Sequence, residues 1–386
     1  MTVKQRQVFY ISGFDPRGAA HYHALYRSQA AKQAEGHGLA IEVSRRRRLS
    51  AHLHQWQLDT RHTRSRYNFL SWDDIIRANW TRGWPAIFTD LCYCLWVYIA
   101  TGRILAFARA SRKQMLAGLY PVLFVLLALT ASGYLGYLAS TLPPFPALPG
   151  GLDSILRSLL AALVCCLAIS GFMGLGNRLA VFWLLRIYAF SAKWARGDIP
   201  GLDQRISVFA DEISRAIEDT DNEEVVIIAH SVGTMLVVLV MARVLAHIQD
   251  RQPFAHRRVV LITLGHCIPL LSFQPSAKPF RQALQRLGQD ARLLWLDYSA
   301  PTDGACFPLL DPVTSCGLIR AREAGPRILS PRFFTLYHAD HYKRLRRAWY
   351  TMHFLYLMAT DKAGPYDFFA FTAGPERVAA RLEQQR

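Results

Sequence analysis

Ser231 lies where an apolar, strand-like run changes directly into an apolar helical pattern. The pentapeptide AHSVG at 229–233 follows the β-branched run 225–228 and precedes a long apolar stretch. A sharp strand-to-helix turn strains its central residue and needs small residues two positions before and after it, which Ala229 and Gly233 supply. The turn lifts the hydroxyl to a helix N-terminus, where free N–H groups favour a developing negative charge. The pattern predicts a nucleophilic serine, and a plain N-cap is the alternative.

These residues resemble the nucleophile elbow of the α/β-hydrolase superfamily, and of its lipase-like members in particular. The G-x-S-x-G pattern of that elbow occurs here with Ala229 in place of the first glycine. The resemblance covers roughly residues 6–50 and 200–375. It implies a serine hydrolase that forms an acyl-enzyme and needs no metal or organic cofactor.

The resemblance also implies two backbone N–H groups that hold the oxyanion. One belongs to the residue after the nucleophile, here Val232. The other comes from a loop after an early strand, and the segment 8–18 fits this loop because a strand-like run ends there in Gly13 and Phe14. We therefore expect the second N–H from Phe14, with an ordinary glycine-containing turn as the alternative.

In this superfamily the acid follows the serine and precedes the base. Two further strand-like segments follow the elbow helix, RRVVLITLG at 257–265 and ARLLWLDYSAPTDG at 291–304. Lipase-like relatives carry their acid a few residues beyond the second of these strands. The resemblance therefore implies Asp303 as the acid and Asp297 as the second candidate, although either residue could instead form a turn.

Three histidines lie in the region where the base is expected. His353 begins an H-x-x-Y pattern that is similar to the position of the catalytic histidine in lipase-like hydrolases, so it is the first choice, followed by His341 and then His338. All three could instead be surface residues of a basic helical segment. His338 and His341 have the H-x-x-H spacing of metal ligands, but no acidic or cysteine cluster accompanies them, and no metal site is expected.

The fold must bring these distant residues together. Strand-like and helix-like segments alternate outside the most apolar stretch, which predicts an α/β fold around a mostly parallel sheet flanked by helices. Far more residues separate the early strand from the serine than one or two βα units require. We therefore expect a hydrolase domain in two parts, at 1–70 and 201–386, interrupted by a membrane-associated insertion at 71–200.

Two uncharged stretches of the insertion are long enough to cross a membrane. Hydrophobic residues make up 52% of the chain and charged residues 19%, which is too apolar for a disordered protein and high for an ordinary soluble enzyme. The stretches lie at about 115–139 and 158–177, and about 20 such residues span a bilayer. They predict a transmembrane hairpin, with two buried core helices as the alternative. The apolar segment 91–102 is too short to span and is expected at the interface.

The basic residues predict the orientation of the hairpin. Lys and Arg outnumber Asp and Glu by 45 to 28, yet the loop at 141–153 carries no Lys or Arg. Arg112 and Lys113 precede the first stretch, and Arg178 and Arg186 follow the second. By the positive-inside rule the loop is external and both termini are cytosolic. We expect a two-span protein of the cytoplasmic (inner) membrane whose active site faces the cytosol.

Together these patterns predict a membrane-anchored serine hydrolase of carboxylic esters or thioesters. Its location makes a lipid or other hydrophobic acyl compound the expected substrate and membrane lipids the expected partner. The alternatives are an acyltransferase with the same triad and a non-catalytic membrane adaptor with a hydrolase-like fold. Nucleic acid is not expected as a partner, because the four arginines at 45–48 occur without an aromatic platform or a groove-reading helix.

Overall fold

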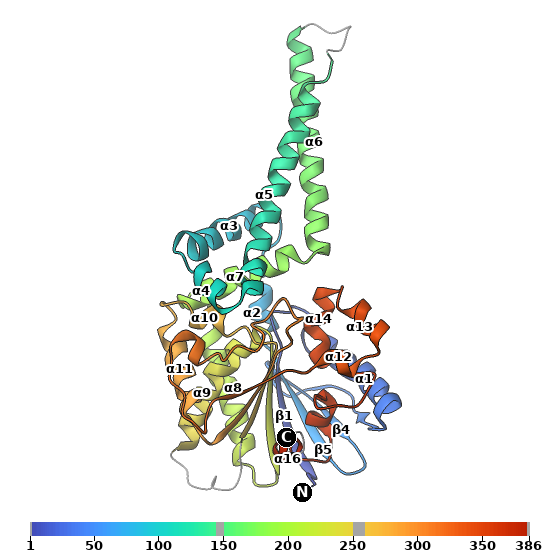
Figure 1. Ribbon diagram of the computed structural model, residues 1–386, viewed down its shortest axis with the longest axis vertical. Coiled ribbons are helices and arrows are strands. Elements are labelled where there is room, and N and C mark those ends of the chain that lie inside the picture. Colours follow the sequence, from blue (N-terminus) through green and yellow to red (C-terminus); the bar gives the residue numbers. More distant parts are fainter. Residues whose placement is uncertain (1, 144–149, 250–258, 384–386) are drawn as a thin grey trace. The chain divides into compact units, whose positions relative to one another are not determined.

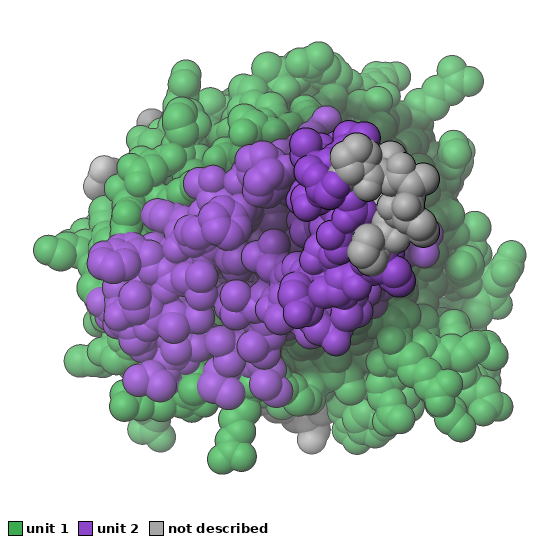
Figure 2. Space-filling model, turned by 90° about the horizontal axis from the view of Figure 1, so that it is seen from above, with its two compact units in different colours: residues 1–80, 106–114, 190–386 green, residues 81–105, 115–189 purple. Residues whose placement is uncertain are grey.

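The chain divides into two compact units, one built around a sheet and one helical (Figures 1 and 2). The computed structural model describes residues 2–143, 150–249 and 259–383. The units comprise residues 1–80, 106–114 and 190–386 for the first, and 81–105 and 115–189 for the second. Both ends of the insertion predicted at 71–200 thus belong to the unit that holds the sheet.

A mixed sheet organises the first unit. Its hydrogen-bonded order is β2-β4-β5-β1-β6-β7-β8-β9, and β3 also pairs with β4. The strands in the described residues are β1 (Gln5–Ile11), β2 (Glu42–Val43), β3 (Arg47–Arg48), β4 (Leu53–Asp59), β5 (Arg64–Leu70), β6 (Glu224–His230), β7 (Val259–Leu264), β8 (Leu293–Tyr298) and β9 (Pro326–Leu329). Neighbours from β5 to β9 run parallel, whereas β2, β3 and β4 form an antiparallel edge. The predicted α/β fold around a mostly parallel sheet is confirmed.

Helices cover both faces of this sheet, which explains why its central strands are continuous apolar runs. Every residue of β6, β7 and β8 is buried. On one face, aromatic side chains of α1 (Gly18–His37) and α15 (Phe368–Ala373) join the sheet in one hydrophobic core. The helices α8 (Leu202–Glu218), α9 (Gly233–Gln249) and α11 (Lys278–Gln289) lie on the other face (Figure 1).

Shorter helices connect these elements. They are α2 (Asp73–Ala78), α10 (Pro269–Ser272), η2 (Thr314–Cys316), α12 (Phe333–Leu336), α13 (Ala339–Leu345), α14 (Trp349–Phe354), η3 (Leu355–Leu357) and α16 (Val378–Glu383). Those after β9 include His341 in α13 and His353 in α14, with His338 directly before α13, and α2 follows β5 directly.

The order of the strands creates a binding position at the carboxyl ends of β1 and β6. From β1 the chain first builds the side of the sheet that contains β5, and it later returns to β6 on the other side of β1. Ile11 at the end of β1 lies opposite Ala229 near the end of β6. Ligands of open parallel sheets bind outside the strands' carboxyl ends at such a switch of direction. The loop after β1 and Ser231 after β6 therefore meet where a site is expected.

The second unit contains two helices that are long and apolar enough to cross a membrane, α5 (Arg112–Ser140) and α6 (Gly150–Arg178). Each includes one of the stretches predicted to span and extends beyond it. Their leucines are largely exposed, for example Leu127 at 65% and Leu167 at 63%. Apolar side chains exposed along such a length are stable in lipid rather than in water. The two helices therefore indicate a membrane protein.

Small residues bring α5 and α6 into close contact. A Cβ atom added to Gly136 would lie 3.1 Å from the Ala161 carbonyl oxygen and 3.3 Å from Cys165 Cβ. In lipid, where helices gain no hydrophobic stabilisation from each other, such close backbone approach is a main source of packing energy. Farther along the pair, the rings of Phe124 and Phe172 meet edge to face at 6.4 Å.

The remaining helices of the insertion include a bent apolar pair. Its members are the continuous run of α3 (Trp84–Cys94) and η1 (Leu95–Ala100), followed by α4 (Ile104–Ala110) with a bend of 67° between them. The described residues thus contain two candidate spans, or three if this bent pair counts as one. The interfacial position of 91–102 stays a prediction. The last helix of the insertion is α7 (Val181–Ala195).

Candidate active site

Ser231 occupies the turn between β6 and α9 in a left-handed backbone conformation. Its φ angle is +56°, which costs a residue other than glycine about 1–3 kcal/mol. Two hydrogen bonds hold the turn: Ser231 N donates to the Leu264 carbonyl at 2.9 Å, and Thr234 Oγ1 donates to the Ser231 carbonyl at 2.5 Å. The strained strand-to-helix turn expected from the AHSVG pattern is therefore present.

Two glycines allow neighbouring backbone to approach this turn. A Cβ atom on Gly233 would lie 2.5 Å from the Ser12 carbonyl oxygen and 2.7 Å from that of Ile11. A Cβ atom on Gly13 would lie 2.8 Å from Ser231 Cβ and 3.2 Å from its Oγ. The shortest separation at each glycine, 2.5 Å at Gly233 and 2.8 Å at Gly13, is too short for real atoms. Only because these residues are glycine can α9 begin against the end of β1 and the following loop lie against the serine.

The two candidate oxyanion donors flank Ser231. Val232 is the next residue in the chain, at the N-terminus of α9, and Phe14 follows Gly13 in the loop that lies against the serine. The Phe14 ring is 1% exposed. It stacks on Trp80 with 5.5 Å between ring centroids and contacts Phe190 at 4.9 Å. This packing fixes the backbone of the loop beside the nucleophile.

A buried carboxylate holds the next residues of the same loop. Asp15 accepts hydrogen bonds from Arg17 Nη2 at 2.6 Å, from Arg17 Nε at 2.8 Å and from the Tyr22 hydroxyl at 2.9 Å. Burial by itself would raise the pKa of Asp15, but the bonds and charge of Arg17 outweigh it, and the pKa lies below its ordinary value. The Arg17 guanidinium also lies over the Phe354 ring, 5.4 Å from its centroid, which connects this loop to α14.

His353 and Asp303 form a fully buried pair. His353 Nδ1 lies 2.8 Å from Asp303 Oδ2 and 3.0 Å from Oδ1, and both side chains are 0% exposed. Burial would raise the pKa of Asp303, but the attraction of His353 and hydrogen bonds, including one from Ala305 N, lower it below its ordinary value. The carboxylate is thus charged and accepts from Nδ1, which leaves Nε2 as the ring nitrogen that is not bonded to Asp303.

His230 links this pair to the residue before the serine. Its Nε2 lies 2.8 Å from the His353 carbonyl oxygen, so Nε2 carries the proton and donates it, and the two rings are 4.7 Å apart. Burial, followed by repulsion from His353, lowers the pKa of His230 to about 3, so the ring is neutral. Ser231 Oγ itself lies 3.8 Å from Cys267 Sγ. The serine and the Asp303–His353 pair therefore belong to one buried cluster.

The alternative histidines lie against a different carboxylate. His341 Nδ1 is 2.9 Å from Asp361 Oδ2, and its side chain is 40% exposed. The backbone N–H of His338 donates to the same oxygen at 2.9 Å. Among the described residues, no group of three or more His, Cys, Asp or Glu side chains could hold a metal ion.

The alternative acid, Asp297, meets a different histidine. It accepts a hydrogen bond from Thr263 Oγ1 at 2.6 Å and another from Ser299 Oγ at 3.1 Å, and its Oδ2 is 3.7 Å from His266 Nε2. Burial raises the pKa of Asp297 above its ordinary value. The structure thus pairs Asp303, and not Asp297, with one of the three histidines that the sequence singled out.

Sequence reasoning assigned no role to two side chains of this cluster. Tyr356 donates a hydrogen bond to Asp303 Oδ2 at 3.0 Å. It is the tyrosine of the H-x-x-Y pattern, so a signal was available. Cys267 lies beside the Ser231 hydroxyl, and burial raises the pKa of its thiol to about 12, which keeps the thiol un-ionised. No motif marks this cysteine.

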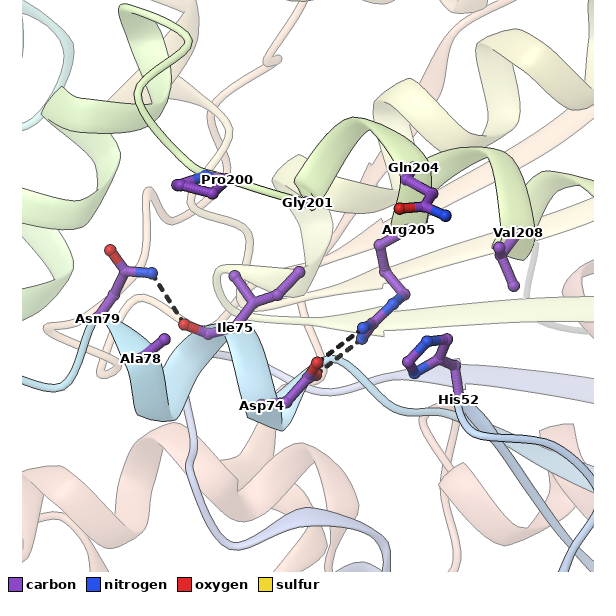
Figure 3. Close-up of a pocket in the computed structure, with 10 residues that line it drawn as sticks. All are labelled: His52, Asp74, Ile75, Ala78, Asn79, Pro200, Gly201, Gln204, Arg205 and Val208. Atoms are coloured by element: carbon purple, nitrogen blue, oxygen red, sulfur yellow. Dashed lines mark hydrogen bonds and ion pairs between the residues drawn. The ribbon is translucent and has the colours of Figure 1, made fainter.

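A cavity of about 560 Å³ lies elsewhere in the sheet unit (Figure 3). It is lined by α2, the N-terminal part of α8 and neighbouring residues: His52, Asp74, Ile75, Ala78, Asn79, Pro200, Gly201, Gln204, Arg205 and Val208. In its wall, the side chains of Arg205 and Asp74 point toward each other, with Arg205 Nη1 and Nη2 each 2.8 Å from a carboxylate oxygen. Its lining contains none of the candidate catalytic residues.

Comparisons of the chain with protein-family models, with curated proteins and with solved structures found no match. A functional assignment therefore depends on the geometry around Ser231, His353 and Asp303.

Proposed function

We propose that this protein is a membrane-anchored serine hydrolase of the α/β-hydrolase type that acts on carboxylic esters or thioesters. One observation carries the proposal: the buried Asp303–His353 pair is tied through His230 to a serine on a strained strand-to-helix turn. The order serine, acid, base along the chain supports the same superfamily. The positions of the three residues support it as well. Ser231 follows the carboxyl end of β6, Asp303 follows that of β8, and His353 lies on α14 after β9.

The residues suit acyl transfer through a covalent intermediate. Ser231 Oγ attacks the carbonyl carbon, and its proton passes to His353 Nε2. Asp303 stabilises the imidazolium through Nδ1, while the N–H groups of Phe14 and Val232 bind the oxyanion. The protonated histidine then releases the leaving group, and water attacks the acyl-enzyme. In the reacting complex the Ser231 hydroxyl must share a hydrogen bond with His353, and such catalytic hydrogen bonds often tighten only when substrate binds.

The membrane helices support the proposed substrate class and orientation. A hydrolase tethered at a bilayer meets acyl lipids at high local concentration, so we assign a lipid or other hydrophobic acyl compound as substrate. The basic flanks of α5 and α6 support our proposal that both termini and the active site lie on the cytosolic side of a cytoplasmic membrane.

A fluorophosphonate probe tests the nucleophile in the full-length protein, extracted in detergent. Wild type is expected to be labelled and Ser231→Ala is not. Cys267→Ala is the matched control because it alters the neighbouring thiol alone, and it should remain labelled. Asp303→Asn and His353→Gln should react about 10²–10⁴ times more slowly, the usual worth of a positioned general base.

The outcome separates the competing functions. Folded wild-type protein that resists the probe would rule out both enzyme readings and favour a non-catalytic membrane adaptor. If labelling occurs, incubation with an ester in the presence of a long-chain alcohol distinguishes the remaining two. A hydrolase releases the free acid, whereas an acyltransferase forms the new ester.

A further inference from the structure

Tyr356 contacts the buried carboxylate of the proposed triad from η3, three residues after His353. Its side chain is 0% exposed. The phenol oxygen accepts a hydrogen bond from Ala300 N at 2.8 Å, and the hydroxyl donates to Asp303 Oδ2 at 3.0 Å. Because the Ala300 N–H approaches one lone pair of the oxygen, the phenolic hydrogen has a defined direction, toward the carboxylate.

Both oxygens of Asp303 are occupied by donors. Oδ2 accepts from Tyr356 and from His353 Nδ1, and Oδ1 accepts from Ala305 N at 3.0 Å and again from His353 Nδ1. A charged carboxylate in a water-free interior is stable only when such donors replace its hydration. Tyr356 supplies the one side-chain O–H among these donors.

The tyrosine ring has little freedom to move. A Cβ atom on Gly265, whose φ is +54°, would lie 2.9 Å from Tyr356 Cε2 and 3.0 Å from Asp303 Oδ2. Glycine at this position therefore makes room for both groups at once. The ring meets Phe333 edge to face at 5.3 Å, and the Tyr366 hydroxyl donates to the Tyr356 carbonyl at 2.5 Å.

We infer that Tyr356 is a positioning residue that aims the Asp303 carboxylate at His353 Nδ1 and shares its negative charge. This inference rests on the proposed function, because its effect is exerted through the catalytic base. A carboxylate that donates part of its charge to a phenol attracts the imidazolium less strongly, so Tyr356 sets the basicity of His353 as well as its orientation.

The surrounding titratable groups make this effect measurable. Burial raises the pKa of Tyr356 well above its ordinary value, so the hydroxyl remains a donor. Burial also raises the thiol pKa of Cys267 and of Cys306, whose Sγ lies 3.9 Å from the Tyr356 hydroxyl, and it lowers that of His230. Between about pH 5 and 8 these four groups therefore keep one charge state, so they do not contribute to a change in labelling rate within that window.

The test measures the second-order rate of fluorophosphonate labelling against pH in full-length protein. Tyr356→Phe removes a single oxygen atom and keeps the ring. We expect a maximal rate about tenfold lower, which is the worth of one hydrogen bond to a charged group. We also expect the acid limb of the profile, where the labelling rate falls at low pH, to be displaced to higher pH. Tyr366→Phe is the matched control, because it removes a buried hydroxyl that contacts the Tyr356 carbonyl and not the carboxylate. The control should stay within twofold of wild type with an unshifted acid limb.

Two further measurements separate positioning from packing. In an Asp303→Asn background, Tyr356→Phe should slow labelling less than twofold, because the charge through which it acts is gone. Placing 3-fluorotyrosine at position 356 strengthens the donor without removing it and should move the acid limb to lower pH. Equal slowing in both backgrounds, or acid limbs that do not move in either variant, would overturn the inference. Wild-type protein that is not labelled at Ser231 would instead refute the proposed function.

Discussion

Ser231 holds a backbone conformation that is unfavourable for a residue with a side chain, and the residues that surround it are small where neighbouring backbone must approach. Gly13 and Gly233 provide this space from two directions, one from the loop after β1 and one from the first turn of α9. Strain of this kind persists only where the surrounding structure enforces it, and it is concentrated at functional sites.

The close approach of Gly13 leads to a prediction for Gly13→Ala. The added Cβ would collide with Ser231 Cβ and Oγ, so the turn or the loop must shift, and overpacking of this kind costs about 1–3 kcal/mol. We expect fluorophosphonate labelling to fall at least about tenfold, since a displacement of this size disturbs nucleophile geometry. Gly304→Ala is the control, because nothing lies within 4 Å of a Cβ there. Similar labelling of the two variants would contradict the proposed arrangement.

The Asp74–Arg205 pair predicts an acid-dependent loss of stability. The hydrogen bonds of Arg205 lower the pKa of Asp74 from its ordinary value to about 2. A carboxylate whose pKa is lower in the folded than in the unfolded state stabilises the fold at pH values above its unfolded pKa. This stabilisation is lost as the pH falls toward the folded pKa. Asp74→Asn should therefore lower the melting temperature at pH 6 and have little effect near pH 2. The side chain is half exposed, so the loss is at most about 1 kcal/mol.

Thermal unfolding in detergent at a series of pH values measures this difference. Asp59→Asn is a suitable control, since its ion pair with Arg64 lies at the exposed sheet edge and should contribute little at any pH. A melting-temperature difference between wild type and Asp74→Asn that stays constant from pH 6 to pH 2 would contradict the expected linkage.

At the scale of single residues, the sequence predicted which residues belong to the candidate site better than it predicted the contacts between them. The AHSVG pattern singled out Ser231 and the H-x-x-Y pattern singled out His353, because both depend on near neighbours in the chain. The choice of Asp303 over Asp297 depended on the family resemblance alone. Both carboxylates are buried and each meets a histidine, so which one meets His353 depends on how the loop after β8 packs against α14.

Among the elements, β1, β6 and the helices after β9 determine where the candidate site forms. The parallel order predicted from alternating segments is present, and the antiparallel edge of β2, β3 and β4 was not foreseen. Short edge strands with charged residues carry little apolar signal, because one side of such a strand faces solvent. The helical hairpin was easier to recognise, because a long apolar stretch without charged residues is by itself sufficient to indicate a membrane span.

The contact between α5 and α6 predicts a specific cross-link. Gly136→Cys would place its Cβ 3.3 Å from Cys165 Cβ, close to the separation of about 3.5–4.5 Å in disulfides. Mild oxidation should therefore form a bond between these residues, detected as a link between peptides after proteolysis. Gly133→Cys, with nothing within 4 Å, should not cross-link, and neither should Gly136→Cys combined with Cys165→Ser. Cross-linking from position 133 in place of 136 would contradict the helix register.

For the whole molecule, the distribution of basic residues predicts topology. A reporter fused after Ser140 should be external, while one at the C-terminus should be cytosolic, because Lys and Arg flank the hairpin and are absent from its loop. The fusions are compared in intact cells with a reporter active on one side of the membrane only. An external C-terminus with a cytosolic N-terminus would require an odd number of spans, which the bent pair of α3, η1 and α4 could supply.

The sequence by itself determined the two helices that are long and apolar enough to span a membrane, the mostly parallel sheet and the strand-turn-helix around Ser231, because each depends on residue types within a few turns of chain. Only the tertiary structure decided which carboxylate meets which histidine, that His230 bonds to the His353 carbonyl, and that Tyr356 donates to Asp303. Those contacts join residues far apart in sequence whose side chains are buried together. Their partners are selected by packing, which no local pattern of residue types encodes.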